Sequence, residues 1–417
     1  MKKIKEYLSD PINSFISFSV ISFLMLIMFF FFSEGSLIRR FFFVDQRDTL
    51  MDYMHSIEFL NGNDPYGSFK TLYPPLANLY YRFIFLLIPS SVKEQWPYIY
   101  SGETYLRKTE FDLRTYQSTL LSYIIPLILF VLLMSFIVDR FFDKESDIRR
   151  TMLKFSLIFS YGVITCIDRG NITFFAIAFL LLFVYYRNDG DKVKREIAVL
   201  LLAVAAGLKL YPALYGIMLL KDKQYATSAR AILYGILSVV VPMFAFNGSF
   251  LENMKIWLSV VFDFAGDTYR MASFSAAVRL YGLPVPMELL GHVLPFIKYA
   301  MIFIMLAGLI LEKREYMILL YISGIIYIFT GEMYYIFGYF VIALVSFLIC
   351  EKKIDRNNAI PFVMILMGVL PLPVFYEINR ILFDYFLMFC ISAYSLKCLY
   401  MYCVSKKGRF KNGFVER

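Results

Sequence analysis

Two aspartates four residues apart, Asp48 and Asp52, form the part of the chain whose spacing most directly suggests chemistry. On a helix, side chains four residues apart face the same way, so two carboxylates would repel each other unless solvent or a cation separates them. A carboxylate in such a place is suited to act as a general base that removes the proton of an attacking hydroxyl. The alternative is a solvated loop helix with acidic residues in its first turn, and the spacing alone leaves both interpretations open.

Two turn-forming motifs follow these aspartates. Residues 61–66 read Asn-Gly-Asn-Asp-Pro-Tyr, a composition typical of turns. Residues 73–76 read Tyr-Pro-Pro-Leu, and their consecutive prolines stiffen the chain directly before an apolar segment. Each motif taken alone is explained by turn formation, but their order after Asp52 is more specific. Tyr66 and Tyr73 within them are candidates to line a substrate groove.

Three cations, Arg169, Lys209 and Arg279, lie at the expected ends of apolar segments or inside one. An ionised side chain near bilayer depth costs at least about 2.5–3.5 kcal/mol, so each is expected to have an anionic partner. The phosphate group of a lipid would serve, because Arg and Lys bind phosphate well. Structural ion pairs would serve equally, and the acidic residues available for them are Asp168, Asp267 and Glu332.

The elements that must position these residues are membrane helices. Of the 417 residues, 59% are hydrophobic and 18% are charged, whereas about 25% charged residues is usual for soluble proteins. This apolar content is enough for on the order of 12 bilayer crossings of about 20 residues each. The composition excludes soluble α/β enzymes, disordered proteins and disulfide scaffolds. We therefore expect an all-α polytopic membrane protein with about 10–12 transmembrane helices, forming one integral membrane domain over residues 1–417.

Charge predicts the orientation of these helices. Lys and Arg gather in short segments between apolar runs, near residues 2–5, 140–150, 187–195, 221–223, 313–314, 352–356 and 406–411. Because cytoplasmic loops are enriched in Lys and Arg, we expect all of these segments and both termini to be cytoplasmic. The net charge of +9 then reflects loops near anionic headgroups, and nucleic acid is not an expected partner.

That orientation requires two features of the chain. Residues 76–92, which contain Arg82 and Pro89, must not cross the bilayer fully. Residues 196–220 must enter and return as a broken-helix hairpin that turns at Lys209-Leu210-Tyr211-Pro212, because about 25 residues are too many for one helix and too few for two. Residues 33–117 then form a large first extracytoplasmic loop with short interfacial helices, and residues 248–286 form a second one.

In this order the motifs resemble those of the polyprenol-phosphate-mannose-dependent mannosyltransferases, which belong to the GT-C class of membrane glycosyltransferases. The resemblance is carried by Asp48, the Gly-x-Asp-Pro-Tyr of residues 62–66 and the Tyr-Pro-Pro-Leu of residues 73–76. Three later segments agree with it, namely Arg169-Gly170-Asn171, Leu208 to Pro212 and Ser275 to Arg279. The resemblance spans residues 15–350. At residues 330–335 the chain departs from the family, because Thr-Gly-Glu-Met-Tyr-Tyr stands where a Ser-Pro…Trp…His segment is expected, so the acceptor and the donor sugar stay open.

The resemblance implies a GT-C-like helix bundle that transfers a hexose, with mannose expected, from a polyprenyl-phosphate sugar donor to a cell-envelope glycan or a lipid-linked acceptor. The reaction would occur at the extracytoplasmic face of the plasma membrane. Asp48 would be the catalytic base, with Asp52 as a competitor or helper. The remaining candidate residues are Arg169, Asn171, Lys209, Tyr211 and Arg279 for the donor phosphate or lipid, and Tyr66, Tyr73, Glu332 and Tyr334 for the substrate groove.

Other readings of the same residues stay open. No metal or other cofactor is expected, since the lipid phosphate is already a stable leaving group and the scattered carboxylates show no metal-ligand pattern. The five cysteines show no Cys-x-x-Cys spacing, and two histidines are too few for a histidine-built metal centre. A non-enzymatic transporter or flippase of lipid-linked glycans would use the same buried cations but would need no base, and a scaffold of an envelope-synthesis complex would need neither.

Overall fold

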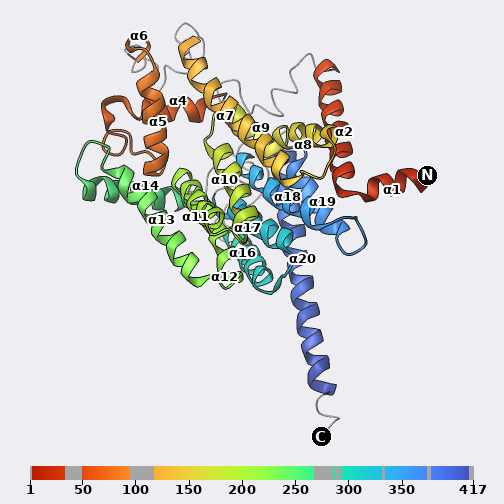
Figure 1. The fold of residues 1–417 in the computed structure, drawn as a ribbon. Helices are drawn as coiled ribbons and strands as arrows, with labels where there is room; N and C mark the ends of the chain where they lie inside the picture. The colour runs from red at the N-terminus through yellow and green to blue at the C-terminus, as the bar shows by residue number, and fades with distance from the viewer. Residues whose placement is uncertain are drawn as a thin grey trace. The chain divides into compact units, whose positions relative to one another are not determined.

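The computed structural model describes residues 2–32, 49–93, 117–266, 293–330, 334–372 and 377–412, together with residues 284 and 286 (Figure 1). Every regular element in these ranges is a helix, which confirms the expected all-α class. The chain divides into two compact units. The central unit comprises Leu24–Asp267, and the terminal unit comprises Met1–Phe23 with Thr268–Arg417.

Five helical segments within the described ranges are long and apolar enough to cross a bilayer, and they are Pro11–Phe29, Gln117–Phe141, Tyr225–Met243, Leu294–Leu311 and Arg380–Val404. The bent pair α8 (Asp147–Ile158) and α9 (Tyr161–Arg169), with 58° between its halves, would make a sixth span. Four shorter apolar segments, Thr173–Tyr186, Glu315–Phe329, Tyr334–Cys350 and Ala359–Val369, have 10–17 residues each. The chain is therefore a multi-pass membrane protein, and a count of 10–12 crossings requires these shorter helices to cross as well.

The central unit is built around α10 (Thr173–Tyr186), an apolar helix that packs against α7 (Gln117–Phe141) and α11 (Lys192–Leu208). Most of the α10 side chains are buried, as is usual for a helix that is hydrophobic on all sides. Helix α11 in turn packs against α13 (Tyr225–Met243) and α5 (Pro75–Leu87), and α14 (Phe250–Gly266) follows α13.

The described part of the expected first loop contains only short helices. They are α4 (Met51–Glu58), η2 (Asn61–Asn63), α5 and α6 (Ser90–Lys93). Helix α5 has 13 residues and therefore spans about 20 Å, which is less than a bilayer crossing.

Helix α11 ends at Leu208, and the chain then reverses. Lys209 has an extended backbone (φ −149°, ψ 133°), after which η6 (Tyr211–Gly216) and α12 (Ile217–Lys221) continue. Pro212 lies in the first turn of η6. Because proline has no backbone N–H, it cannot donate the hydrogen bond that would continue α11. The break therefore coincides with the Lys-Leu-Tyr-Pro sequence.

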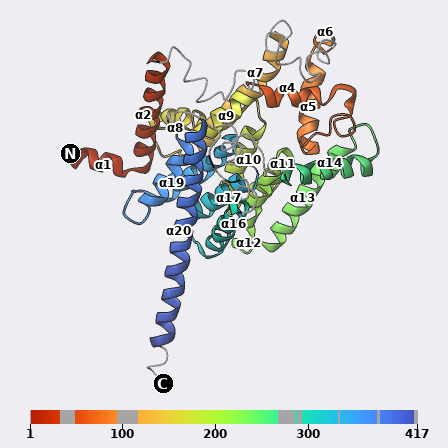
Figure 2. The same ribbon diagram turned by 180° about the vertical axis from the view of Figure 1, so that it is seen from behind.

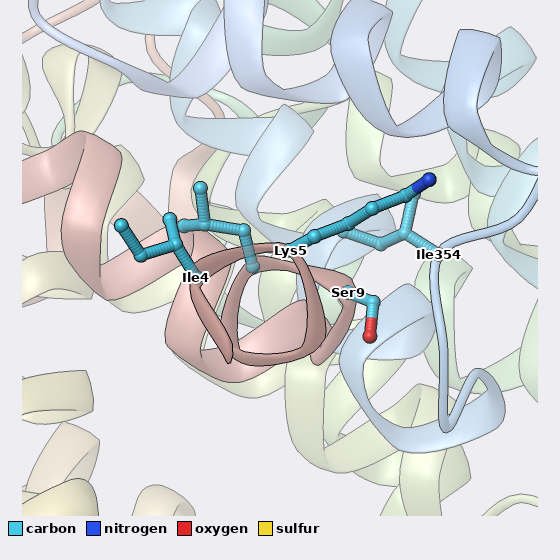
Figure 3. Close-up of a pocket in the computed structure, with 5 residues that line it drawn as sticks. Ile4, Lys5, Ser9 and Ile354 are labelled. Carbon is cyan, nitrogen blue, oxygen red and sulfur yellow. The ribbon is translucent and has the colours of Figure 1, made fainter. Parts of the chain in front are cut away.

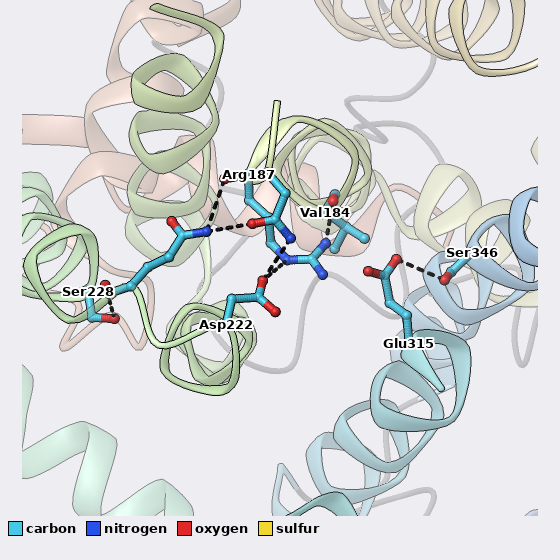
Figure 4. A network of polar contacts seen from close by, with 8 residues as sticks. Val184, Arg187, Asp222, Ser228, Glu315 and Ser346 are labelled. Atoms are coloured by element: carbon cyan, nitrogen blue, oxygen red, sulfur yellow. Dashed lines mark hydrogen bonds and ion pairs between the residues drawn. The ribbon is translucent and has the colours of Figure 1, made fainter. Parts of the chain in front are cut away.

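Asp222, directly after α12, lies beside the end of α10. Its carboxylate accepts hydrogen bonds from Arg187 Nε and Asn188 Nδ2, each at 2.9 Å (Figure 4). Arg187 directly follows α10 and lies five residues before α11 begins, so α11, η6 and α12 together leave one end of the central unit and come back to it. The basic segments at residues 187–195 and 221–223 therefore lie at the same end of this unit.

The terminal unit contains α1 (Lys2–Ser9), the start of α2 (Pro11–Phe32), α16 (Leu294–Leu311), α17 (Glu315–Phe329), η8 (Tyr334–Tyr339), α18 (Phe340–Cys350), α19 (Ala359–Val369) and α20 (Glu377–Asn412) (Figure 2). Helices α17 and α18 pack against each other, and most of the residues in each are buried. Ser346 of α18 donates a hydrogen bond to Glu315 at the start of α17 at 3.0 Å (Figure 4).

Candidate functional site

Helix α4 carries Asp52 and is held against the end of α9. Leu50, directly before the helix, has a left-handed backbone (φ 57°), and its N–H donates to the carbonyl of Asp168 at 2.7 Å. The helix begins at Met51, so Asp52 lies in its first turn and the helix does not extend back to Asp48. Asp48 itself lies outside the described residues.

Helix α9 ends in a Schellman motif that turns the chain toward Asp52. Gly170 adopts a left-handed backbone (φ 64°), and the N–H of Asn171 donates to the carbonyl of Cys166 at 2.8 Å. A Cβ on Gly170 would lie 2.5 Å from the Cβ of Tyr53 in α4. Only glycine therefore allows α4 and α9 to approach this closely while the chain turns.

The Asp52 carboxylate is occupied by two side chains from this turn. Arg169 donates to it twice, from Nε to Oδ2 at 3.0 Å and from Nη2 to Oδ1 at 2.8 Å. Asn171 donates a third hydrogen bond from Nδ2 to Oδ2 at 2.6 Å. The side chain of Asp52 is 16% exposed. Arg169 thus has an acidic partner, the Asp52 carboxylate.

Both the nitrogen and the oxygen of the Asn171 side-chain amide are hydrogen-bonded. Its Oδ1 accepts from the backbone N–H of Thr173 at 3.0 Å and from the Thr173 hydroxyl at 2.6 Å, and Asn171 is fully buried. These bonds determine which end of the amide faces Asp52, because only the NH₂ group can donate to a carboxylate. The start of α10 therefore orients the group that contacts Asp52.

The surroundings of Asp52 favour its ionised form. Burial raises the pKa of this carboxyl, but the charge and hydrogen bonds of Arg169, with smaller contributions from Lys209 and Asn171, hold the pKa below its usual value. A carboxylate with a lowered pKa that already accepts three hydrogen bonds is a weak proton acceptor. Asp52 is better suited to hold Arg169 and Asn171 in place than to remove a proton.

Lys209 joins this group from the break after α11. Its ammonium lies 4.0 Å from the centre of the Tyr73 ring, within the range of a cation–π contact. It is also near enough to Asp52 to contribute to the lowered pKa of that carboxyl. Three separate parts of the chain, α4, the turn after α9 and the break after α11, therefore bring Asp52, Arg169, Asn171 and Lys209 together.

The two turn motifs that follow α4 support Tyr73. Asn78 of α5 donates from Nδ2 to the hydroxyl of Tyr66 at 3.0 Å and to the carbonyl of Tyr73 at 3.2 Å. Tyr66 is fully buried and contacts Phe246 edge to face, so its ring belongs to the interior of the central unit. Leu76 of the Tyr-Pro-Pro-Leu motif packs against Gly207 of α11. The approach is close, because a Cβ on Gly207 would lie 2.8 Å from Leu76 Cδ2.

The remaining sequence candidates lie elsewhere. Tyr211 begins η6, two residues after Lys209. Tyr334 begins η8 of the terminal unit. Arg279 and Glu332 lie outside the described residues, as do Asp48 and Asp267. No group of three or more His, Cys, Asp or Glu side chains arranged to hold a metal ion occurs among the residues that the structure describes.

Sequence reasoning missed the pairing of Asp52 with Arg169 and Asn171. The motif Arg-Gly-Asn was recognised, but nothing in the spacing connects it with an aspartate 117 residues earlier. The glycine of Asp-Arg-Gly-Asn predicts the end of a helix and a turn, but it does not predict which residue the turn faces. Glu58, a buried acid at the end of α4, was also missed.

Comparison with known proteins gives one family. The profile of glycosyltransferase family 87 matches residues 113–349, which is more than half of the chain and includes Arg169, Asn171 and Lys209. The match does not extend to residues 48–76, where Asp48, Asp52 and the two turn motifs lie. A search of curated proteins found no match.

Proposed function

Because the chain belongs to glycosyltransferase family 87, we propose that it transfers a hexose, with mannose expected, from a polyprenyl-phosphate sugar to a cell-envelope glycan or lipid-linked acceptor. One observation carries this proposal. The cluster of Asp52, Arg169, Asn171 and Lys209 combines a half-buried cation at a helix break with a held carboxylate, directly after the segment that contains Asp48.

In the proposed reaction, Asp48 is the general base. Its carboxylate takes the proton of the acceptor hydroxyl while the hydroxyl oxygen forms a bond to C1 of the sugar. The bond between C1 and the phosphate oxygen breaks, and polyprenyl phosphate leaves with the electron pair. The configuration at C1 inverts. Asp52 acts as a positioning residue. Its carboxylate ties α4 to the turn after α9, and this fixes the position of Met51, which follows the segment that contains Asp48.

Lys209 is the proposed partner of the donor phosphate. Its ammonium lies at non-helical backbone inside an otherwise apolar segment, and such backbone at membrane depth needs a protein-lined or hydrated cavity. A phosphate anion there would pair with the ammonium, which lies over the ring of Tyr73, and Tyr73 is the proposed wall of the sugar groove beside it. Arg169, occupied by Asp52, orients the site, while Tyr211, Arg279, Glu332 and Tyr334 remain proposed contacts for the lipid and the sugar.

The arrangement of α10 and α11 supports an extracytoplasmic site. Asn171 and Lys209 lie at one end of these two helices, and Arg187 and Lys192 lie at the other. The helices have 14 and 17 residues, so the two ends are roughly 21–25 Å apart. Because basic segments favour the cytoplasm, the cluster is proposed to face the opposite side, with both termini cytoplasmic in the plasma membrane.

The direct test is transfer activity of the purified protein with defined donors. Polyprenyl-phosphate mannose and polyprenyl-phosphate glucose are each incubated with the protein in lipid nanodiscs and an envelope glycolipid extract, and both donor loss and labelled product are measured. Asp48→Asn should reduce kcat at least about 100-fold, because the amide keeps the shape but cannot accept the proton. Donor binding should be retained.

Asp52→Asn is the matched variant, since it makes the same chemical change four residues later. It should lower activity less than Asp48→Asn and should also lower thermal stability, because it replaces the ion pair with Arg169 by a weaker, uncharged hydrogen bond. Normal turnover of Asp48→Asn with an inactive Asp52→Asn would assign the base to Asp52. Normal turnover of both would refute a carboxylate base in this segment.

Lys209 is tested by binding rather than by turnover. Lys209→Met should weaken donor binding about tenfold or more while changing stability little, and Lys209→Arg should restore part of the affinity because the charge is kept and the geometry is not. Titration of polyprenyl-phosphate mannose beside a melting curve separates the two effects. Normal donor affinity with early melting in Lys209→Met would make Lys209 a structural residue.

A further inference from the structure

A second feature, in the terminal unit, is a groove between the N-terminal helix and a distant loop. It is lined by Ile4, Lys5, Leu8 and Ser9 of α1 and by Ile354, and it has a volume of about 480 Å³ (Figure 3). Small-molecule and lipid sites in proteins commonly have volumes of about 300–1,000 Å³. Three of the five lining side chains are aliphatic, and one carries an ammonium group.

The two sides of the groove are joined by the backbone. The N–H of Ile354 donates to the carbonyl of Ser9 at 2.7 Å, so the loop after α18 is fixed to the end of α1. Two basic segments far apart in sequence, at residues 2–5 and 352–356, thereby come together.

The position of α1 places this groove at the membrane surface. The candidate span Pro11–Phe29 begins two residues after α1 ends, so α1 directly precedes a helix that enters the bilayer. On α1, Ile4 is 64% exposed and Tyr7 is 51% exposed. Exposed apolar side chains beside lysines on a short helix are typical of a helix that lies in the headgroup region.

The charges around the groove favour an anion. Five basic side chains here are exposed and make no hydrogen bond or ion pair with any residue that the structure describes, namely those of Lys3, Lys5, Lys352, Lys353 and Arg356. The acids of the same two segments, Glu6, Asp10, Glu351 and Asp355, are fewer than these cations. Asp10 accepts from the N–H of Asn13 at 2.9 Å, Asp355 accepts from the N–H of Asn357 at 2.7 Å, and Glu351 accepts from Asn358 Nδ2 at 3.0 Å.

We propose that this groove binds one anionic phospholipid of the bilayer. The headgroup phosphate pairs with Lys5, with the lysines of the 352–353 segment nearby, and an acyl chain lies along Ile4, Leu8 and Ile354. The lipid would fasten α1 and the 351–358 loop to the same membrane surface. The site belongs to the terminal unit and does not depend on any step of glycosyl transfer.

The test uses the full-length protein, freed of lipid in detergent and titrated with phosphatidylglycerol while bound lipid is counted by native mass spectrometry. One phosphatidylglycerol should bind more tightly than phosphatidylcholine. Lys5→Gln should weaken that binding about fivefold, the effect expected of one basic residue near an anionic headgroup. Lys5→Arg should keep it, and Ile354→Asn should weaken it through the acyl chain.

Lys3→Gln is the matched control, because it removes the same charge from the same helix at a residue that does not line the groove. Its affinity should stay within about twofold of wild type. Equal weakening by Lys3→Gln and Lys5→Gln would show general attraction of α1 to an anionic surface and would overturn the proposal. Equal binding of phosphatidylcholine, or full competition by soluble glycerol 1-phosphate, would overturn it as well.

Discussion

At the scale of single residues, two acids in the same short helix have opposite environments. Asp52 accepts three hydrogen bonds and lies beside Arg169, which holds its pKa below the usual value. Glu58, six residues later, is buried with no such cation among the residues that the structure describes, and burial raises its pKa to about 8. One acid in α4 is therefore kept ionised and the other is kept protonated at neutral pH.

Glu58 gives the protein a predictable dependence on pH. Its pKa is raised above the unfolded value of about 4.3, so the folded state holds the proton between these two values and loses relative stability as the pH rises toward 8. Glu58→Gln removes the titrating group. The melting temperature of the variant should match wild type near pH 5 and exceed it by roughly 3 °C or more at pH 8.

The control for this measurement is Glu252→Gln, which changes an exposed glutamate in the first turn of α14. Its melting temperature should follow wild type across the same pH range. A Glu58→Gln curve parallel to wild type from pH 5 to pH 8 would mean that Glu58 is ionised throughout.

At the scale of elements, the close approach of α4 and α9 depends on Gly170. Gly170→Ala would require a left-handed backbone at alanine and would place its Cβ 2.5 Å from Tyr53 Cβ. We expect a loss of about 1–3 kcal/mol in stability and a larger loss of activity, because α4 must move away from the turn that holds Asp52. Gly190→Ala is the matched control, since a Cβ there meets nothing within 4 Å. Equal melting temperatures of the two variants would contradict this account.

Some of these elements could be predicted from the sequence and others could not. The break after α11 was readable because Pro212 and Lys209 interrupt an apolar run, and both are local signals. The all-α class followed from composition. The pairing of Asp52 with Arg169 could not be read, because it joins residues 117 apart and depends on the direction in which Gly170 turns the chain. The start of α4 at Met51 was equally hidden, since it depends on the bond from Leu50 to Asp168.

At the scale of the whole molecule, the central unit has two chemically different ends. Arg187, Asn188 and Asp222 meet at one end of α10 and α11, beside basic segments of the sequence. Asn171 and Lys209 lie at the other end, near Asp52. A bilayer around these helices would place the two ends on opposite sides of the membrane. The side that the Asp52 and Lys209 end faces then determines whether it can reach cytoplasmic or extracytoplasmic substrates.

Cysteine labelling of intact cells tests this orientation. In a background without the five native cysteines, Ser68→Cys reports on the exposed segment between α4 and α5, and Lys192→Cys reports on the exposed start of α11. A membrane-impermeant maleimide should modify position 68 in intact cells and position 192 only after permeabilisation, because residues 187–195 are basic and such segments stay in the cytoplasm. Position 192 labelled from outside, with position 68 protected, would reverse the orientation. The cluster at Asp52 and Lys209 would then face the cytoplasm, and an extracytoplasmic polyprenyl-phosphate donor would be excluded.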